Sequence, residues 1–172
     1  MAAKTNAELA AFFNTGDQPS ETEFGHLIDT IQPVPVLIPG DGSVTAFTVA
    51  DHAFRTIIID GSTTTDRSYA LPVPALGTWY HFIYHGDLDD DGDNKDVAIT
   101  QLAGDFLKGN IVHLNASDAT GLADPVVFNG TNAIGVSLDV GNFADIWIMG
   151  YTSSLSYIWG MTVGDTVADV LT

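Results

Sequence analysis

The sequence predicts a mostly β fold, in which an antiparallel β-sandwich or jelly-roll-like domain follows a short N-terminal helix-turn-helix arm. Two capping-box signals open the chain, a proline-rich stretch follows them, and β-branched and aromatic runs dominate from Val44 onward. These runs recur about every 8–12 residues with turn dipeptides between them, which is typical of sandwiches and barrels. We therefore expect an arm over residues 1–32, a Pro/Gly linker over 33–43 and a β-sandwich domain over 44–172.

Composition and charge narrow the range of functions. The chain has 172 residues, of which 45% are hydrophobic, so one domain with a sizeable core is expected. It carries 22 acidic residues against 5 basic ones, which gives a net charge of -17. So few bases cannot neutralise phosphates, and this excludes nucleic acids and anionic membrane surfaces as partners. The chain has no cysteine, so disulfides and thiolate chemistry are excluded as well.

The N-terminal arm is predicted from two capping boxes. Thr5 and Glu8 open the first helix, and Ser20 and Glu23 open the second. Between them the string "NTGDQP" breaks the helical pattern with a glycine and a proline. Apolar side chains then follow at helical spacing on one face of each helix. These faces comprise Leu9, Phe12 and Phe13 in the first helix, and Phe24, Leu27, Ile28 and Ile31 in the second.

The two helices are too short to be stable alone. Each covers about ten residues, and an isolated helix needs about 12–15 residues even for marginal stability. Their aromatic faces must therefore dock on another surface. That surface is either the chain's own β domain, or a sister subunit or a larger assembly, and the sequence leaves these alternatives open.

The β domain is predicted from a series of short strands. Each candidate is rich in β-branched or aromatic residues and is bounded by turn residues such as Asn129-Gly130. No internal repeat indicates a propeller or a solenoid. The candidates are "VTAFTVA", "RTIIID", "SYALPV", "WYHFIYH", "VAITQL", "IVHLN", "PVVFN", "AIGVSLDV", "DIWIMGYT" and "LSYIWGMTV".

The strand candidate "WYHFIYH" carries large side chains on both faces. Successive side chains of a strand point to opposite sides, so Trp79 and His81 lie on one face and Tyr80 and Phe82 on the other. A monomer rarely leaves such a surface exposed. We therefore expect a second sheet to cover one face, and an arm or another subunit to cover the face that holds Trp79 and His81.

A candidate calcium site lies in "HGDLDDDGDNKD". Closely spaced carboxylates around a glycine suit Ca²⁺, which takes 6–8 oxygen ligands in a flexible loop. The string lacks the glutamate that closes an EF-hand, and strands flank it in place of helices. It resembles the strand–loop–strand calcium hairpins of integrin-type repeats, in a single copy. Either the loop holds a structural Ca²⁺ ion or it is a charged hairpin tip. The candidate ligands are Asp87, Asp89, Asp91, Asp93 and Asp96.

No catalytic motif is present in the sequence. The strings that mark serine hydrolases, zinc peptidases, nucleotide-binding loops and dinucleotide-binding folds do not occur. The histidines show no usual ligand spacing, so we interpret them as packed or surface residues. The sequence therefore predicts a binding or structural protein and no enzyme.

The segment "FFNTGDQPSETEFGHLIDTI" resembles an N-terminal module of tailed-bacteriophage virion proteins. That module has a short aromatic helix, then G-D-x-P-[ST], then x-x-x-F-x-x-L-I-D-[ST]. The matching positions are Gly16, Asp17, Pro19, Ser20, Phe24, Leu27, Ile28, Asp29 and Thr30. A second likeness covers part of the β region, where an L-P pair leads to A-x-x-G-x-x-Y-x-F. Its positions are Leu71, Pro72, Ala75, Gly77, Tyr80 and Phe82.

The resemblance implies a structural protein of the virion. We expect a capsid decoration (cement) protein that is made in the host cytoplasm, binds the major capsid protein on the outer head surface and acts as a homotrimer. One alternative is a head or tail fibre protein that contacts host glycans as a receptor-binding protein. Another is a calcium-dependent carbohydrate-binding β-sandwich module.

Overall fold

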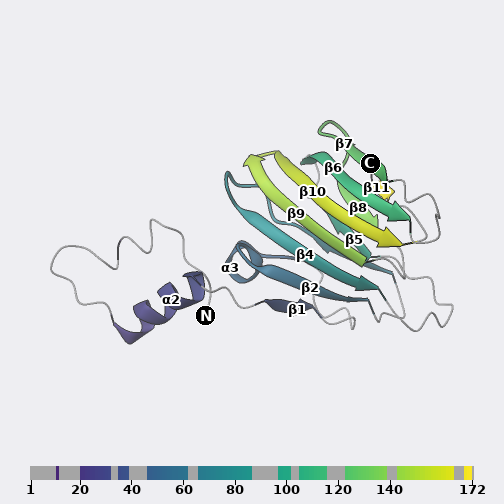
Figure 1. Cartoon of the computed structure of the whole chain (residues 1–172). Coiled ribbons are helices and arrows are strands. Elements are labelled where there is room, and N and C mark those ends of the chain that lie inside the picture. Colours follow the sequence, from purple (N-terminus) through teal and green to yellow (C-terminus); the bar gives the residue numbers. More distant parts are fainter. Residues whose placement is uncertain are drawn as a thin grey trace.

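The computed structural model describes residues 11, 20–31, 35–38, 46–61, 66–86, 97–101, 105–115, 123–138, 143–164 and 169–171. Within these ranges the strands form two sheets, which confirms the prediction of a mostly β protein. Figure 1 shows the larger sheet in front of the smaller one. In the same view the helix α2, Glu21–Ile31, lies to the side of the two sheets. No helix among the described residues is long and apolar enough to cross a membrane.

The larger sheet has seven strands in the order β1-β2-β4-β9-β10-β6-β7. Its central hairpin joins β9 to β10, which pair antiparallel. On either side of that hairpin the pairing is mixed, because β2 and β4 are parallel, as are β6 and β10. The strands are β1 Val36–Ile38, β2 Thr56–Gly61, β4 Trp79–Gly86, β9 Phe143–Thr152, β10 Leu155–Gly164, β6 Phe106–Asn115 and β7 Ala123–Asn129.

The smaller sheet has four strands in the order β11-β8-β5-β3. Here β3 and β5 pair parallel, whereas the other neighbours pair antiparallel. The strands are β3 Arg67–Ala70, β5 Val97–Thr100, β8 Gly135–Leu138 and β11 Asp169–Leu171.

The hydrophobic core lies between the two sheets. Phe82 in β4 and Tyr69 in β3 are fully buried, and the Phe47 ring bridges them with centroid distances of 5.3 and 5.5 Å. The inward side chains of the other strands complete this layer, as expected when one face of each sheet is removed from water. They include Ile57, Ile59, Tyr84, Ile99, Leu107, Ile111, Val136, Leu138, Ile146, Ile148 and Ile158.

The antiparallel, jelly-roll-like expectation is not what the described strands show. Four neighbouring pairs are parallel: β1 with β2, β2 with β4, β3 with β5, and β6 with β10. The physical reason is the path of the chain. From β2 to β5 it alternates between the two sheets, so two strands that meet in one sheet are separated by a crossing and can run the same way.

Two local elements differ from the sequence prediction. The stretch "VTAFTVA" was expected to be a strand, but its last two residues begin the short helix α3, Val49–His52. Thr48 caps this helix, because its Oγ1 accepts a hydrogen bond from the Asp51 N–H at 3.1 Å. The expected linker over 33–43 contains β1, which has prolines on both sides of it in the sequence and which pairs with β2 at the edge of the sheet as described.

The second helix of the arm begins as the sequence predicts. The Ser20 N–H donates to Glu23 Oε2 at 2.6 Å, and the Glu23 N–H donates to Ser20 Oγ at 3.3 Å, which completes the capping box. The backbone N–H and the hydroxyl of Ser20 both donate to the Glu23 carboxylate, and this holds the pKa of that carboxyl below its usual value. Phe24 is 47% exposed on this helix. Leu27 is half-buried, and the side chains of Ile28 and Ile31 lie outside the described residues.

Candidate functional site

Three central rows of side chains cross the strands on the outward side of the seven-stranded sheet. Alternation of buried and accessible residues in β9 and β10 places one set of side chains in the core and the other on this side. The strand register then aligns the outward residues into rows. We call these rows the outer face. They are Trp79–Met149–Tyr157–Lys108–Asn129, Thr56–His81–Trp147–Trp159–Asn110–Val127 and Ile58–Ile83–Asp145–Met161–Val112–Pro125.

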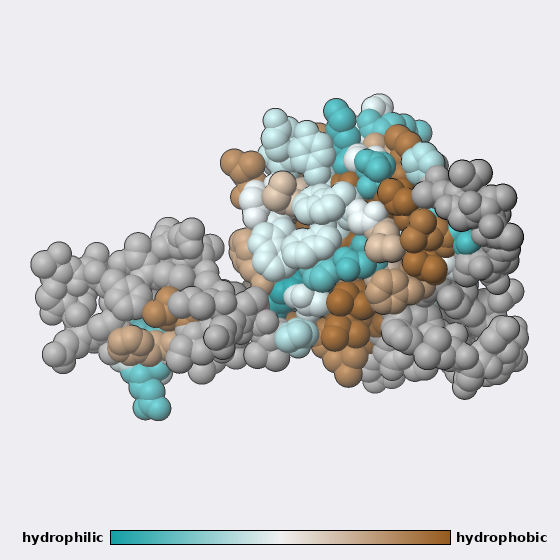
Figure 2. All heavy atoms as spheres, in the orientation of Figure 1, coloured by the Kyte–Doolittle hydropathy of each residue, from teal (hydrophilic) through white to brown (hydrophobic). Residues whose placement is uncertain are grey.

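The outer face is apolar and partly open to solvent. Trp159 and Val127 in the middle row are 42% and 64% exposed, and Met161 and Val112 in the third row are also exposed. Figure 2 views the molecule from this side and shows pale and brown spheres around a short teal band. Isolated exposed apolar residues are ordinary, but a contiguous patch of this kind marks an interaction surface.

The chain's three tryptophans all lie on the outer face. The Trp147 ring lies between the other two, with centroids 5.2 Å from Trp79 and 6.1 Å from Trp159. The planes of Trp147 and Trp159 differ by only 10°. The imidazole of His81 covers another part of Trp147, at 4.1 Å and 11°. At this distance the imidazole of His81 overlaps the face of Trp147, whereas Trp79 is tilted by 40° against it.

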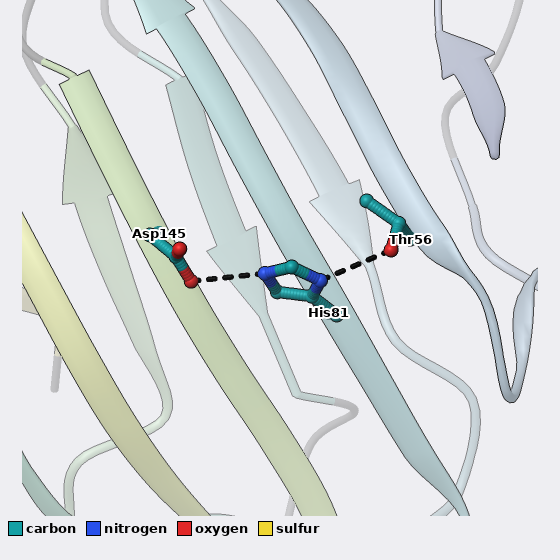
Figure 3. A network of polar contacts seen from close by, with 3 residues as sticks. All are labelled: Thr56, His81 and Asp145. Carbon is teal, nitrogen blue, oxygen red and sulfur yellow. Dashed lines mark hydrogen bonds and ion pairs between the residues drawn. The ribbon is translucent and has the colours of Figure 1, made fainter.

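His81 is held in place by two side chains from the neighbouring strands. Its Nδ1 lies 3.0 Å from Thr56 Oγ1, and its Nε2 lies 2.9 Å from Asp145 Oδ1 (Figure 3). The neutral tautomer with the proton on Nε2 satisfies both bonds, because it donates to the carboxylate and accepts from the hydroxyl. This network fixes the plane of the imidazole ring, and therefore fixes the stack on Trp147.

The hydroxyl–imidazole–carboxylate order of this network resembles that of a hydrolase triad, but its hydroxyl lies within a paired strand of the sheet. A triad needs backbone or side-chain donors aimed at the developing oxyanion. Thr56 lies at the start of β2, which is paired with β1 on one side and β4 on the other. The sheet ladders therefore take up the backbone N–H groups beside it. Among the described residues no group of three or more His, Asp or Glu side chains could hold a metal ion. The network serves to position His81.

The outer face is almost free of charge, although the chain as a whole carries -17. Its three rows contain one carboxylate, Asp145, and one ammonium group, Lys108. The outward side of the four-stranded sheet offers a contrast, because the register aligns the small residues Ser68, Ala98 and Ser137 there. Large apolar side chains are thus concentrated on one outward side of the sandwich. Interface cores show the same enrichment in aromatic residues and methionine and the same loss of charge.

The structure places two of the predicted interface residues on this face. Trp79 and His81 point outward from β4, whereas Tyr80, Phe82 and Tyr84 are buried, so the predicted two-sided strand is confirmed. The predicted arm residues Leu9, Phe12 and Phe13 lie outside the described residues. Phe24 and Leu27 belong to α2 and are separate from the outer face (Figure 1).

The predicted calcium ligands Asp87, Asp89, Asp91, Asp93 and Asp96 lie outside the described residues. The strands on either side of them are described, and they correct one premise. β4 belongs to the seven-stranded sheet and β5 to the four-stranded sheet, so the stretch that joins them is not a hairpin between paired strands. The strand–loop–strand likeness therefore does not extend to the pairing of the flanking strands.

Sequence reasoning missed most of the outer face. The sequence analysis did not predict Trp147, Thr56 or Asp145, which contact His81. It also missed Trp159, which lies nearly parallel to Trp147. The signal that could have found the tryptophans is the two-residue period that was used for β4. Large outward residues also alternate in "WIM" of β9 and in "YIWGM" of β10. The partnership of His81 with Thr56 depends on a parallel pairing, which the sequence does not reveal.

Comparison of the chain with protein-family models, with curated proteins and with solved structures gives no match.

Proposed function

We propose that this chain is a structural protein of a tailed-phage particle, a capsid decoration (cement) protein that acts as a homo-oligomer on the outer head surface. The observation that carries the proposal is the large, nearly uncharged outer face on a strongly acidic chain. A surface of this composition is suited to burial against protein. The virion assignment comes from the resemblance of Phe12–Ile31 to the N-terminal module of phage structural proteins.

In this proposal the arm and the outer face have different partners. The outer face joins copies of the chain, and the arm binds the major capsid protein. Phe24 supports the role of the arm, because it lies 47% exposed on α2 beside Leu27. A helix of this length gains its stability from docking. In the view of Figure 1 the helix α2 lies to the side of the sheets, and this position suits a segment that contacts the capsid lattice.

The ring geometry favours contact with protein over contact with sugars at the outer face. A sugar ring stacks on an open aromatic face. Here the His81 ring lies over Trp147 at 4.1 Å, and Trp159 is nearly parallel to Trp147. Neighbouring rings on both adjacent strands therefore occupy the faces of Trp147, the central ring. This arrangement supports decoration over the fibre and carbohydrate-binding alternatives, both of which need glycan contact.

The test mixes the purified protein with undecorated heads of the parent phage and measures co-sedimentation and added density by electron microscopy. We expect saturable binding at a fixed number of copies per head, and resistance of the decorated heads to heat. The variant Phe24→Ser should lower head binding without unfolding the β domain, and Val73→Ser, an exposed position between β3 and β4, is the matched control. Binding to a glycan array without binding to heads would contradict the proposal.

A further inference from the structure

We propose that the outer face docks on the same face of a second copy of this chain, about a two-fold axis that passes beside Trp159. In this arrangement Lys108 of each copy pairs with Asp145 of the other. This arrangement rests on the proposed function, in which the outer face is the surface that joins copies of the chain. A two-fold pair takes the place of the trimer that the sequence resemblance implies.

The first argument is the symmetry of the rows about Trp159. Lys108 lies on β6 opposite Tyr157, and Asp145 lies on β9 opposite Met161. These two positions are therefore one strand to either side of β10, and two residues to either side of Trp159. When two such faces meet, a two-fold axis that lies between them beside Trp159, perpendicular to the line from Lys108 to Asp145, exchanges the two positions. Each charge then lies opposite its counterpart.

The second argument is area. The three rows extend over six strands at ~4.8 Å spacing and over about six residues at ~3.3 Å each, which gives a flat footprint of roughly 600 Å². Tyr151 and Phe143, both exposed at the margins of the rows, extend it toward the ~800 Å² per partner of a stable interface. A docked helix of the length of α2 would cover only about 160 Å². A second sheet fits this area, and a single helix leaves most of it uncovered.

The third argument is charge. Two copies carry -17 each and repel one another at any acidic contact. The three rows have a formal charge of zero from the Lys108 and Asp145 side chains, so a like-charged copy can approach here. A two-fold contact also needs one self-complementary surface, whereas a three-fold ring needs two different complementary ones. Within the described residues one large outward apolar face is present.

The test is zero-length cross-linking of the wild-type protein. A carbodiimide joins a carboxylate to an amine with loss of water only when the two groups touch. Within one chain the Cα atoms of Lys108 and Asp145 are about 16 Å apart, from two strand spacings and four residues of strand. A Lys108–Asp145 link can therefore form only between copies. We expect the linked peptides by mass spectrometry in the dimer band, with mixed ¹⁴N/¹⁵N pairs when labelled and unlabelled protein are combined.

Charge reversal provides the second arm of the test. Lys108→Asp and Asp145→Lys should each weaken dimerisation about tenfold or more in sedimentation equilibrium, and the double variant should restore it. Asp66→Lys, at an exposed position before β3, makes the same charge change away from the face and should leave dimerisation intact. Thermal unfolding of each variant at low protein concentration identifies any variant that fails to fold. The cross-linking result does not depend on the variants, because it uses the wild-type protein.

The outcomes separate the inference from the proposed function. Three results would overturn the two-fold arrangement: a dimer without the Lys108–Asp145 link, dimerisation that neither charge reversal weakens, and a trimer as the smallest assembly. Association of the chain that requires a basic partner protein would overturn it as well. A monomer that still binds phage heads would overturn the inference and leave decoration standing. A dimer with the Lys108–Asp145 link that does not bind phage heads would support the two-fold arrangement and contradict decoration.

Discussion

The imidazole of His81 lies flat against the indole of Trp147, with ring centroids 4.1 Å apart and 11° between the planes. The two residues are cross-strand partners on β4 and β9. Asp145 and Thr56 hold the imidazole from either side. This arrangement makes the middle of the outer face a rigid aromatic surface, because three strands fix the ring plane together. Rigid aromatic groups lose little entropy when they are buried in an interface.

Substitution of His81 should separate the stability that comes from its stacking on Trp147 from the stability that comes from its two hydrogen bonds. His81→Phe keeps a ring over Trp147 and loses both hydrogen bonds, so we expect a cost of about 1 kcal/mol. His81→Ala loses the stack as well and should cost about 2–3 kcal/mol. Urea denaturation of both variants measures the difference. Equal stabilities of the two variants would show that the stack contributes nothing.

Trp159 should matter more for association than for folding. Its side chain is 42% exposed, so Trp159→Ser should change the free energy of unfolding of a monomer by about 1 kcal/mol or less. The same change should weaken self-association about tenfold or more, since a central tryptophan is a frequent hot spot. Light scattering over a dilution series measures this, and Val73→Ser serves again as the exposed control. Unchanged association would place the interface elsewhere.

Gly160 should tolerate no side chain. It follows Trp159 on the inward side of β10 with φ of +148°, and an added Cβ would lie 2.1 Å from the Asp145 carbonyl oxygen. Gly160→Ala should therefore cost about 3–5 kcal/mol. Gly77→Ala is the matched control, because Gly77 has φ of +78° and open space around the Cβ position. It should cost only about 1–2 kcal/mol. Similar losses in the two variants would contradict the close approach of β10 and β9.

His52 should make stability depend on pH. Burial lowers the pKa of His52, and the charge of Asp51 opposes this effect. The Thr48 N–H also donates to His52 Nδ1 at 3.0 Å, which only an unprotonated nitrogen accepts. With the folded pKa below the unfolded value, the unfolded chain binds the proton more readily. The stabilising contribution is therefore fully present above the ordinary pKa of about 6.5 and is lost as pH falls through the folded value.

The measurement for His52 is urea denaturation of the wild-type chain and of His52→Asn between pH 8 and pH 5. The wild-type advantage should be greatest above about pH 7 and should shrink as the pH falls. The comparison cancels the titration of the many aspartates, because both proteins contain them. An advantage that grows at low pH would show that the charged form of His52 is favoured in the fold.

The aspartates from Asp87 to Asp96 should respond to calcium if the sequence prediction is right. Removal of Ca²⁺ with a chelator should lower the melting temperature of the wild-type protein, and added Ca²⁺ should restore it. The double variant Asp89→Ala and Asp91→Ala should melt at the lower temperature with or without chelator. Equal melting temperatures of the wild-type chain in chelator and in Ca²⁺ would show that these aspartates hold no stabilising Ca²⁺ ion and contribute only their charge.

Local signals predicted local structure well. The capping box from Ser20 to Glu23 and the alternation from Trp79 to Tyr84 rest on neighbours in the sequence, and both are confirmed. The pairing of strands depends on residues far apart in the chain. The parallel pairs β2–β4 and β6–β10 were therefore missed, and with them the contacts of His81 with Thr56 and of Lys108 with the β10 rows. The strand β1 was hidden because prolines on both sides made its sequence look like a linker.

The emission of the three tryptophans tests the central claim most directly, because all three lie on the outer face and no other part of the chain contributes. If a second copy covers this face, concentrated protein should emit at short wavelength and resist quenching by acrylamide. Dilution through the dissociation range should then shift the emission to longer wavelength and increase quenching in parallel with the loss of dimer. An emission maximum and a quenching constant that stay the same at all concentrations, with the protein folded throughout, would contradict the account.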